Sequence, residues 1–250
     1  RMTEMLRDEW AETLAAGGST YLWGDFPTIP LVEKRPEDRL QQLDVSGLTC
    51  RFATNDKGIA DVDLSIKRGS FVVVTGRVGS GKSTLLRAIL GLLPKQKGEI
   101  RWNNELIEAP DNFFVPPRSA YVPQVPQLYS DTLKNNILMG LPEDKVDIPL
   151  ALWRAALEEV EELLENGLDT LVGPRGVKLS GGQMQRAAAA RMFVRDAELL
   201  VFDDLSSALD VDTERKLWAR MFENRDNTCL VVSHRPSVLR DADYIIVMKD

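Results

Sequence analysis

The hydrophobic positions of this chain change their spacing several times, and each change predicts a different kind of structure. Apolar side chains recur at helical spacing through residues 1–16, and Gly17-Gly18 ends that pattern. The stretch up to about Pro36 mixes glycine, proline and isolated aromatic residues, which predicts an irregular connector. From about Leu43 onward, short apolar and β-branched runs begin, and these are typical of strands.

The strands predicted after Leu43 alternate with helices. The strand-like runs are Leu43–Phe52, Ile59–Ile66, Phe71–Thr75, Leu199–Phe202, Cys229–Ser233 and Tyr244–Met248. Helices are predicted from near Gly81, over most of residues 125–190 and near Asp212–Phe222. This alternation favours a largely parallel sheet covered by helices on both faces.

Composition and charge narrow the class of protein. The sequence has 250 residues, 44% hydrophobic and 28% charged, which suits one large globular domain or one domain with an extension. A net charge of −7 disfavours an electrostatic nucleic-acid binder, so we expect no nucleic-acid partner. Two cysteines, Cys50 and Cys229, cannot build a disulfide framework. No apolar run approaches the roughly 20 residues needed to cross a bilayer.

A glycine-rich turn follows the buried run Phe71–Thr75 and reads G-x-x-x-x-G-K-[ST]. Glycines let the backbone curl so that amide N–H groups point at an anion, and the helix that begins there adds its positive end. Lys82 supplies a charge for the outer phosphates, and the Ser83 hydroxyl suits Mg²⁺. The residues expected to bind the nucleotide here are Gly76, Arg77, Val78, Gly79, Ser80, Gly81, Lys82, Ser83 and Thr84.

Two carboxylates, Asp203 and Asp204, end a later apolar run. Because ligands gather beyond the carboxyl ends of parallel strands, we expect this end to lie beside the phosphate loop. Asp203 is then expected to hold Mg²⁺, usually through water, and Asp204 to face the nucleophilic water.

A third motif indicates a family. Leu179–Gln183 reads L-S-G-G-Q, precedes an alanine-rich helix and resembles the signature sequence of ATP-binding cassette (ABC) ATPases. The resemblance covers about Leu43 to the end, with the motifs in the family's order. It implies an α/β fold: a P-loop NTPase (RecA-like) core with a mainly parallel sheet, a small antiparallel β subdomain and a helical signature subdomain at about 125–190. It also implies ATP and Mg²⁺ as cofactors.

The resemblance gives roles to further residues. Gln124, in a stretch that resembles the Q-loop, would contact Mg²⁺ and water, and Asp210 would lie near the nucleotide in a D-loop. His234, the single histidine, resembles the switch residue that contacts the γ-phosphate. The residues expected to be catalytic are Asp204, His234, Gln124 and Lys82. Phe52 falls where the family stacks an aromatic ring on adenine, although core packing explains a strand phenylalanine equally well.

Other stretches resemble exporters within this family. Ser130–Ile137 resembles the segment after the exporter Q-loop. Thr170–Gly176 resembles the exporter X-loop, although Pro174 stands where an acidic residue is usual. Arg1–Arg7 is similar to the tail of a transmembrane domain that leads into the cassette. Together these imply a cytoplasmic ATPase at the plasma (inner) membrane.

The expected organisation follows from that resemblance. Residues 1–42 would be a linker and the end of a preceding transmembrane region, and 43–250 an ABC nucleotide-binding domain truncated at its C-terminus. The chain would meet the membrane only through the transmembrane domain of the same transporter. The transported substrate cannot be predicted, because membrane helices outside this sequence would select it.

In the family, two cassettes pair head to tail, and each signature closes on the ATP held by its partner. The residues implied to contact that partner's nucleotide are Ser180, Gly181, Gly182 and Gln183. ATP would join the two cassettes and hydrolysis would release them, an order of events able to move attached membrane helices.

One residue departs from the family pattern. The family's general base is a glutamate directly after the Mg²⁺-binding aspartate, and this chain has Asp204 there. Misplacing a catalytic group by roughly 1 Å can lower the rate on the order of 10²-fold. We therefore expect slow hydrolysis at this site and a heterodimer in which the intact signature serves a partner that carries the glutamate.

Three alternatives stay open at this point. The chain could be a regulatory nucleotide-binding cassette without significant hydrolysis. It could be a soluble ABC ATPase of DNA repair or translation, although about a hundred residues between phosphate loop and signature leave no room for long coiled coils. It could also belong to an importer, which the exporter-like stretches disfavour.

Overall fold

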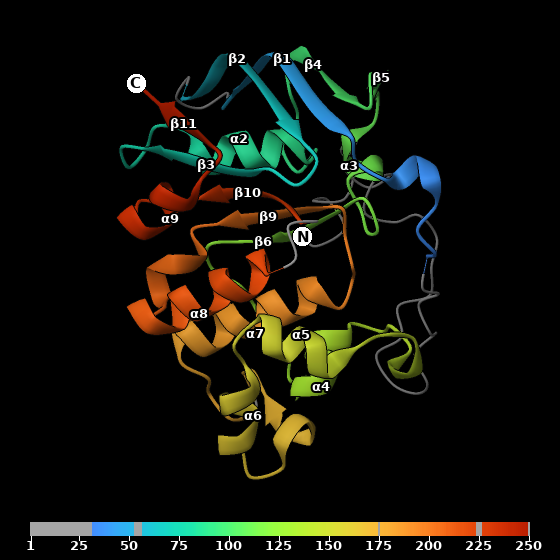
Figure 1. Cartoon of the computed structure of the whole chain (residues 1–250), viewed down its shortest axis with the longest axis vertical. Coiled ribbons are helices and arrows are strands. Elements are labelled where there is room, and N and C mark those ends of the chain that lie inside the picture. The colour runs from blue at the N-terminus through green and yellow to red at the C-terminus, as the bar shows by residue number, and fades with distance from the viewer. Residues whose placement is uncertain (1–31, 53–56, 175, 224–226, 250) are drawn as a thin grey trace, which may run out of the picture.

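The computed structural model describes residues 32–52, 57–174, 176–223 and 227–249. The helix predicted for residues 1–16 and most of the connector lie outside the described residues. Figure 1 shows an antiparallel sheet above a helix, a parallel sheet in the middle, and a helical region below it. The layers agree with the α/β class expected from the sequence.

A parallel sheet forms the centre of the molecule. In spatial order its strands are β11 (Tyr244–Met248), β3 (Phe71–Gly76), β10 (Thr228–Val232), β9 (Leu199–Asp203) and β6 (Ser119–Val122). Every neighbouring pair in this order is parallel. Four of the five strands were predicted, and β6 was not, because four residues carry too short a pattern to be distinguished from a loop.

Both faces of the inner strands β3, β9 and β10 are buried, as their unbroken apolar runs predict, whereas the edge strand β11 is largely exposed. In β3, Phe71 and Val73 belong to one hydrophobic core, and Val72 and Val74 belong to another on the opposite face. The first core contains residues of α7 and α8, and the second contains residues of α2 and the antiparallel sheet. These helices are α2 (Lys82–Ile89), α7 (Gly181–Phe193) and α8 (Val211–Phe222).

The predicted antiparallel subdomain is confirmed. Its strands lie in the order β2 (Gly58–Lys67), β1 (Gln42–Arg51), β4 (Lys97–Trp102) and β5 (Glu105–Leu106), and all pairs are antiparallel. The sequence did not predict β4 or β5. The signal in β4 was an alternation in which Ile100 and Trp102 are buried between more exposed neighbours.

The predicted helical middle of the chain is also present. Its elements are β7 (Asp131–Thr132), α4 (Leu133–Leu138), η2 (Glu143–Lys145), α5 (Ile148–Arg154), α6 (Glu158–Leu163), η3 (Gly167–Asp169), β8 (Leu171–Val172) and α7. The remaining short elements are η1 (Pro36–Asp38), α3 (Pro110–Phe113), η4 (Leu205–Ala208) and α9 (Pro236–Asp241). In the part of the chain that the structure describes, none of the helices has the length and apolar character to cross a membrane.

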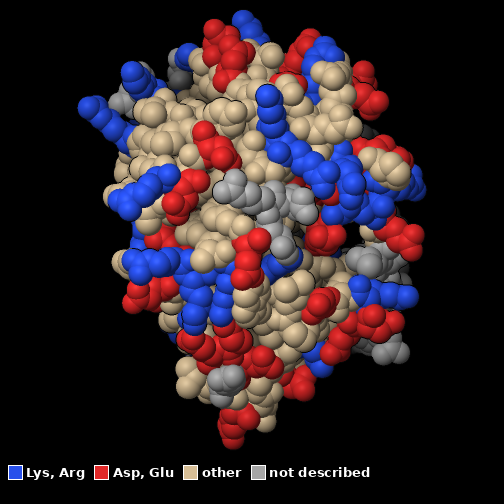
Figure 2. Space-filling view, in the orientation of Figure 1, with Lys and Arg blue, Asp and Glu red and all other residues tan. Residues whose placement is uncertain are grey.

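Ion pairs join the acidic helix α6 to α8. Glu158 pairs with Arg220 at 2.6 Å, and Glu159 pairs with Lys216 at 2.5 Å. Figure 2 shows this side of the molecule with basic side chains directly beside acidic ones. The carboxylates of α6 therefore connect the helical region to the layer below the parallel sheet.

Candidate functional site

The phosphate loop lies between β3 and α2. Gly76 has φ +144°, and a Cβ there would come within 2.4 Å of the Met248 carbonyl oxygen, so only glycine fits. Gly81 occupies the N-cap of α2 with φ +89° and offers no side chain to the first-turn amides. Those amide N–H groups therefore stay available to an anion, together with the positive end of the helix.

Two polar side chains of this loop also suit a phosphate. The Lys82 ammonium donates to the carbonyl oxygens of Gly76 and Arg77, at 3.0 and 2.7 Å, so it spans the loop. The Ser80 hydroxyl is buried and has no hydrogen-bond partner. An unpartnered buried hydroxyl and uncapped helix amides are donors that phosphate oxygens would satisfy, so the residues present fit a nucleotide.

The end of β9 meets this loop, as the sequence predicted. Asp203, the last residue of β9, is 1% exposed, and its Oδ1 accepts a 2.8 Å hydrogen bond from the Ser83 hydroxyl on α2. Its Oδ2 accepts from the Tyr121 hydroxyl on β6 at 3.1 Å. A hydroxyl and a carboxylate oxygen side by side are ligands of the kind that Mg²⁺ prefers.

The protein alone offers only part of a metal shell here. Among the described residues, no group of three or more histidine, cysteine, aspartate or glutamate side chains could hold a metal ion. Mg²⁺ is usually bound by one or two protein groups together with substrate phosphates and water. The pair of Ser83 and Asp203 fits that arrangement.

Asp204 lies directly beside the metal-binding pair. Its backbone has φ +56°, in the left-handed region that aspartate tolerates better than most residues, and its amide donates to the Val232 carbonyl. Gln124 Nε2 donates to Asp204 Oδ2 at 3.3 Å. Burial raises the pKa of Asp204, and His234, the Gln124 hydrogen bond and Lys82 offset part of that rise. A raised pKa makes the carboxylate a better proton acceptor.

His234 is oriented from the neighbouring strand end. Its Nδ1 lies 3.4 Å from the Thr75 hydroxyl, near the end of β3. The histidine follows β10, so β3, β9 and β10 each end at this site.

Most of the predicted site residues line one cavity of about 380 Å³, whereas Gly76, Arg77 and Ser80 of the phosphate loop do not. Of the residues predicted from the sequence, it is lined by Phe52, Val78, Gly79, Gly81, Lys82, Ser83, Thr84, Gln124, Asp203, Asp204 and His234. Phe52 lies just past β1 and is 40% exposed, which argues against the core-packing explanation of this ring. Sequence reasoning missed Lys57 and Gly58, which line the same cavity, because no motif marks the stretch in which they lie.

The signature lies away from this cavity. Ser180 accepts from the Gln183 amide at 3.2 Å, and Gln183 Oε1 accepts from the Ser180 amide at 2.8 Å, which forms a capping box at the start of α7. Gly182 packs closely against η4, and a Cβ on Gly182 would lie 2.7 Å from the carbonyl oxygen of Ala208. None of Ser180, Gly181, Gly182 and Gln183 lines the cavity that contains Lys82.

The D-loop leads into α8. Asp210 caps this helix, and its Oδ1 accepts from the Thr213 amide at 2.9 Å. That hydrogen bond lowers the pKa of Asp210. Asp210 is exposed beside the signature and does not line the Lys82 cavity.

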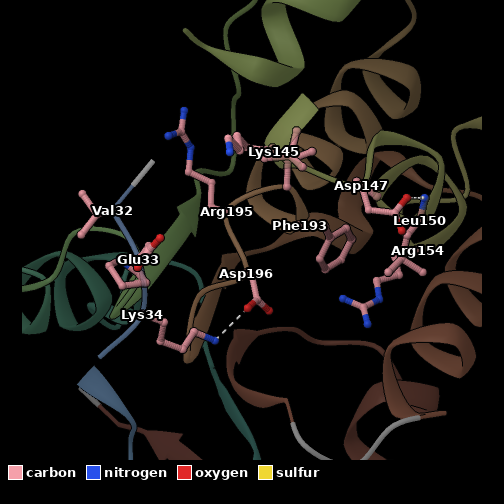
Figure 3. A pocket seen from close by; sticks show the side chains of 14 residues that line it. Val32, Glu33, Lys34, Lys145, Asp147, Leu150, Arg154, Phe193, Arg195 and Asp196 are labelled. Atoms are coloured by element: carbon pink, nitrogen blue, oxygen red, sulfur yellow. Dashed lines mark hydrogen bonds and ion pairs between the residues drawn. The ribbon is translucent and has the colours of Figure 1, made fainter. Parts of the chain in front are cut away.

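A second cavity, of about 340 Å³, lies between residues 32–34, the helix α5 and the C-terminal end of α7. Figure 3 shows Lys34 and Asp196 joined on one side of it, with Phe193 and Arg154 on the other. Lys34 pairs with Asp196 at 3.0 Å and with Glu198 at 2.9 Å. No residue of the phosphate loop lines this cavity, and it is slightly smaller than the one that contains Lys82, Ser83 and Asp203.

The chain is similar to known proteins. A family described as "ABC transporter" matches residues 59–207. An ATP-dependent lipid A-core flippase of Alkalilimnicola ehrlichii is 38% identical over 246 residues, which cover 96% of this chain and 42% of the relative. An uncharacterized ABC transporter ATP-binding protein of Bacillus subtilis, YwjA, is 36% identical over 233 residues, with 88% and 40% covered.

A solved structure is similar as well. The structure of a bacterial Atm1-family ABC exporter with ATP bound matches with a TM-score of 0.78 and 27% identity, over 99% of this chain and 42% of that one. The chain therefore spans less than half the length of these relatives. The matched family and the identity to full-length relatives show that the chain belongs to the ABC transporter family.

Proposed function

We propose that this chain is the ATP-binding and ATP-hydrolysing cassette of an ABC exporter at the cytoplasmic face of the plasma (inner) membrane. The observation that carries the proposal is the cavity in which Lys82, Ser83 and Asp203 meet at the ends of parallel strands. The names of the relatives, an ATP-dependent flippase and an exporter with ATP bound, support it. We also propose residues 1–42 as linker and end of a transmembrane region, and 43–250 as the nucleotide-binding domain.

The chain's own groups would bind the nucleotide as follows. Phe52 offers a partly exposed ring at the cavity edge for the adenine face. Lys82 and the α2 amides would hold the phosphates, and Ser83, Asp203 and Gln124 would hold Mg²⁺. When bound, Mg²⁺ neutralises negative charge that develops on the phosphates.

Hydrolysis would depend on the groups around Asp204. Asp204 is proposed to accept a proton from the attacking water, since burial raises its pKa. Gln124 donates to the same carboxylate and would help to orient that water. His234 lines the cavity from β10 and would contact the γ-phosphate.

The proposed partners are a transmembrane domain of the same transporter and a second cassette. The signature helix begins outside the cavity, with exposed Ser180 and Gly181, which supports contact with a nucleotide on a partner. Asp204 in place of the family's glutamate supports a heterodimer in which the other site hydrolyses faster. A regulatory cassette without significant hydrolysis is the second candidate, and the same Asp204 favours it.

Replacement of Lys82 with alanine tests the proposal. The variant loses a charged hydrogen-bond donor in the phosphate loop, so Mg-ATP affinity is expected to fall at least about tenfold. Affinity is measured by titration of a fluorescent ATP analogue into the assembled transporter. Lys97→Ala removes an exposed lysine at the first residue of β4, is the matched control and should bind Mg-ATP as the unaltered protein does. Equal affinity in both variants would contradict the proposed site.

The trans role of the signature has its own test. Ser180→Ala and Thr132→Ala each remove the side-chain cap of a helix, α7 and α4 respectively, and each should lower the free energy of unfolding by about 1 kcal/mol. Only Ser180→Ala is expected to lower ATP turnover of the paired cassettes as well. Turnover and urea unfolding are measured on the same samples. Equal turnover in the two variants would contradict the trans role and assign Ser180 to helix capping alone.

A further inference from the structure

Tyr121 makes a contact that the motifs do not assign. It lies on β6, three residues before Gln124, and its hydroxyl is 3.1 Å from Oδ2 of Asp203. Oδ1 of the same carboxylate is engaged by Ser83 at 2.8 Å. Each oxygen of the buried Asp203 carboxylate therefore has its own partner, from two different elements.

Arg87 fixes the direction of the tyrosine hydrogen bond. Its Nε lies 3.4 Å from the Tyr121 oxygen, and its Nη2 lies 3.8 Å from Asp203 Oδ2. An arginine side chain only donates, so the phenol oxygen accepts from Arg87 and its own hydrogen points at Asp203. The hydroxyl thus serves as a donor to the carboxylate and cannot act as its acceptor.

The terminal torsion of an aspartate is broad, so a carboxylate without partners can rotate about its axis. Hydrogen bonds to a ligating carboxylate hold its orientation, and removal of such an outer partner typically lowers metal affinity about 10- to 100-fold. The Asp203 carboxylate is held at Oδ2 by Tyr121, and this leaves Oδ1 directed at the Ser83 hydroxyl.

We infer that Tyr121 is a positioning residue for Mg²⁺, because its hydroxyl orients Asp203 toward the metal and the nucleotide phosphates. This inference rests on the proposed function of the same cavity. Tyr121 itself does not line the cavity, so it acts through Asp203 and makes no contact with the ligand.

Tyr121→Phe tests the inference in the assembled transporter. Binding of a fluorescent ATP analogue is titrated with Mg²⁺, and once more with EDTA in place of the metal. The Mg²⁺ concentration that gives half of the maximal increase in binding of the ATP analogue is expected to rise about tenfold in Tyr121→Phe. Binding in EDTA should not change, because the phosphate loop and Lys82 stay intact. Tyr244→Phe, in the edge strand β11, is the matched control and should leave both values unchanged.

A second variant separates the hydrogen bond from packing. Replacement of Tyr121 with 4-aminophenylalanine keeps a ring and a donor at the same place, so the Mg²⁺ midpoint is expected to return toward that of the unaltered protein. An unchanged midpoint in Tyr121→Phe, or no recovery with the amino analogue, would overturn the inference. Either result leaves the proposed function standing as long as the unaltered protein binds the ATP analogue. If the unaltered protein does not bind the analogue, the inference about Tyr121 and the proposed function are both refuted.

Discussion

Replacement of Arg235 with methionine is expected to lower the free energy of unfolding by about 3–5 kcal/mol, because it leaves a buried carboxylate without its cation. Glu214 on α8 is 1% exposed, and its Oε2 lies 3.1 Å from Nη1 of Arg235. Methionine keeps most of the arginine stem, so the lost charge dominates the effect. Urea unfolding followed by circular dichroism measures the change.

Two controls separate burial from charge. Arg215, which lies on α8 like Glu214, forms an ion pair with Asp212 at 3.6 Å, and both of these side chains are more than 70% exposed. Arg215→Met should therefore have little effect, since exposed ion pairs contribute little. In the double variant of Arg235→Met and Glu214→Leu, the buried charge is gone and most of the stability should return. A loss as large in the double variant would assign the effect to other contacts of Arg235.

This ion pair also joins the segment after β10 to the segment at the start of α8. Arg235 directly follows His234, and its Nη2 donates to the carbonyl oxygen of Leu209, the residue before Asp210. Glu214 holds the same guanidinium from the first turn of α8. The segment that carries His234 and the segment that we propose to face a second cassette are therefore fixed to one another through this pair.

Local patterns predicted the parts of the site that local physics determines. The unbroken apolar run Phe71–Thr75 and the glycines after it specify a strand, a turn and a helix start within about a dozen residues, and the structure has them at β3 and α2. The pairing of Asp203 with Ser83 was also predictable, because parallel strands present their carboxyl ends at one edge.

What the sequence could not predict depends on the spatial order of strands. β6 is only four residues long, and it forms because Tyr121 pairs with Val201 of β9, far along the chain. The contact of Tyr121 with Asp203 spans 82 residues and exists only because β6 lies next to β9. Periodicity within a short segment carries no information about which strand lies beside it.

Replacement of Asp204 with glutamate is expected to raise ATP turnover at this site by up to about 10²-fold, with ATP affinity unchanged. The longer side chain extends the carboxylate by one methylene toward the place where the family carries its base, while Lys82 and Asp203 keep their contacts. The gain should come with a loss of stability of about 1 kcal/mol, because residue 204 has φ +56° and aspartate tolerates this region better than glutamate. Single-turnover hydrolysis and thermal unfolding measure the two effects.

Asp204→Asn is the matched control, since it keeps the size of the side chain and removes the proton acceptor. It should bind ATP as the unaltered protein does and lose hydrolysis at this site, whereas the glutamate variant binds equally and hydrolyses faster. Asp204→Glu tests how far the carboxylate must reach, and Asp204→Asn tests whether a proton acceptor is needed at all. If single-turnover hydrolysis is equally negligible with aspartate, asparagine and glutamate, no side chain at this position supports the reaction. The regulatory cassette would then be the better description, because nucleotide binding would persist without a contribution of residue 204 to hydrolysis.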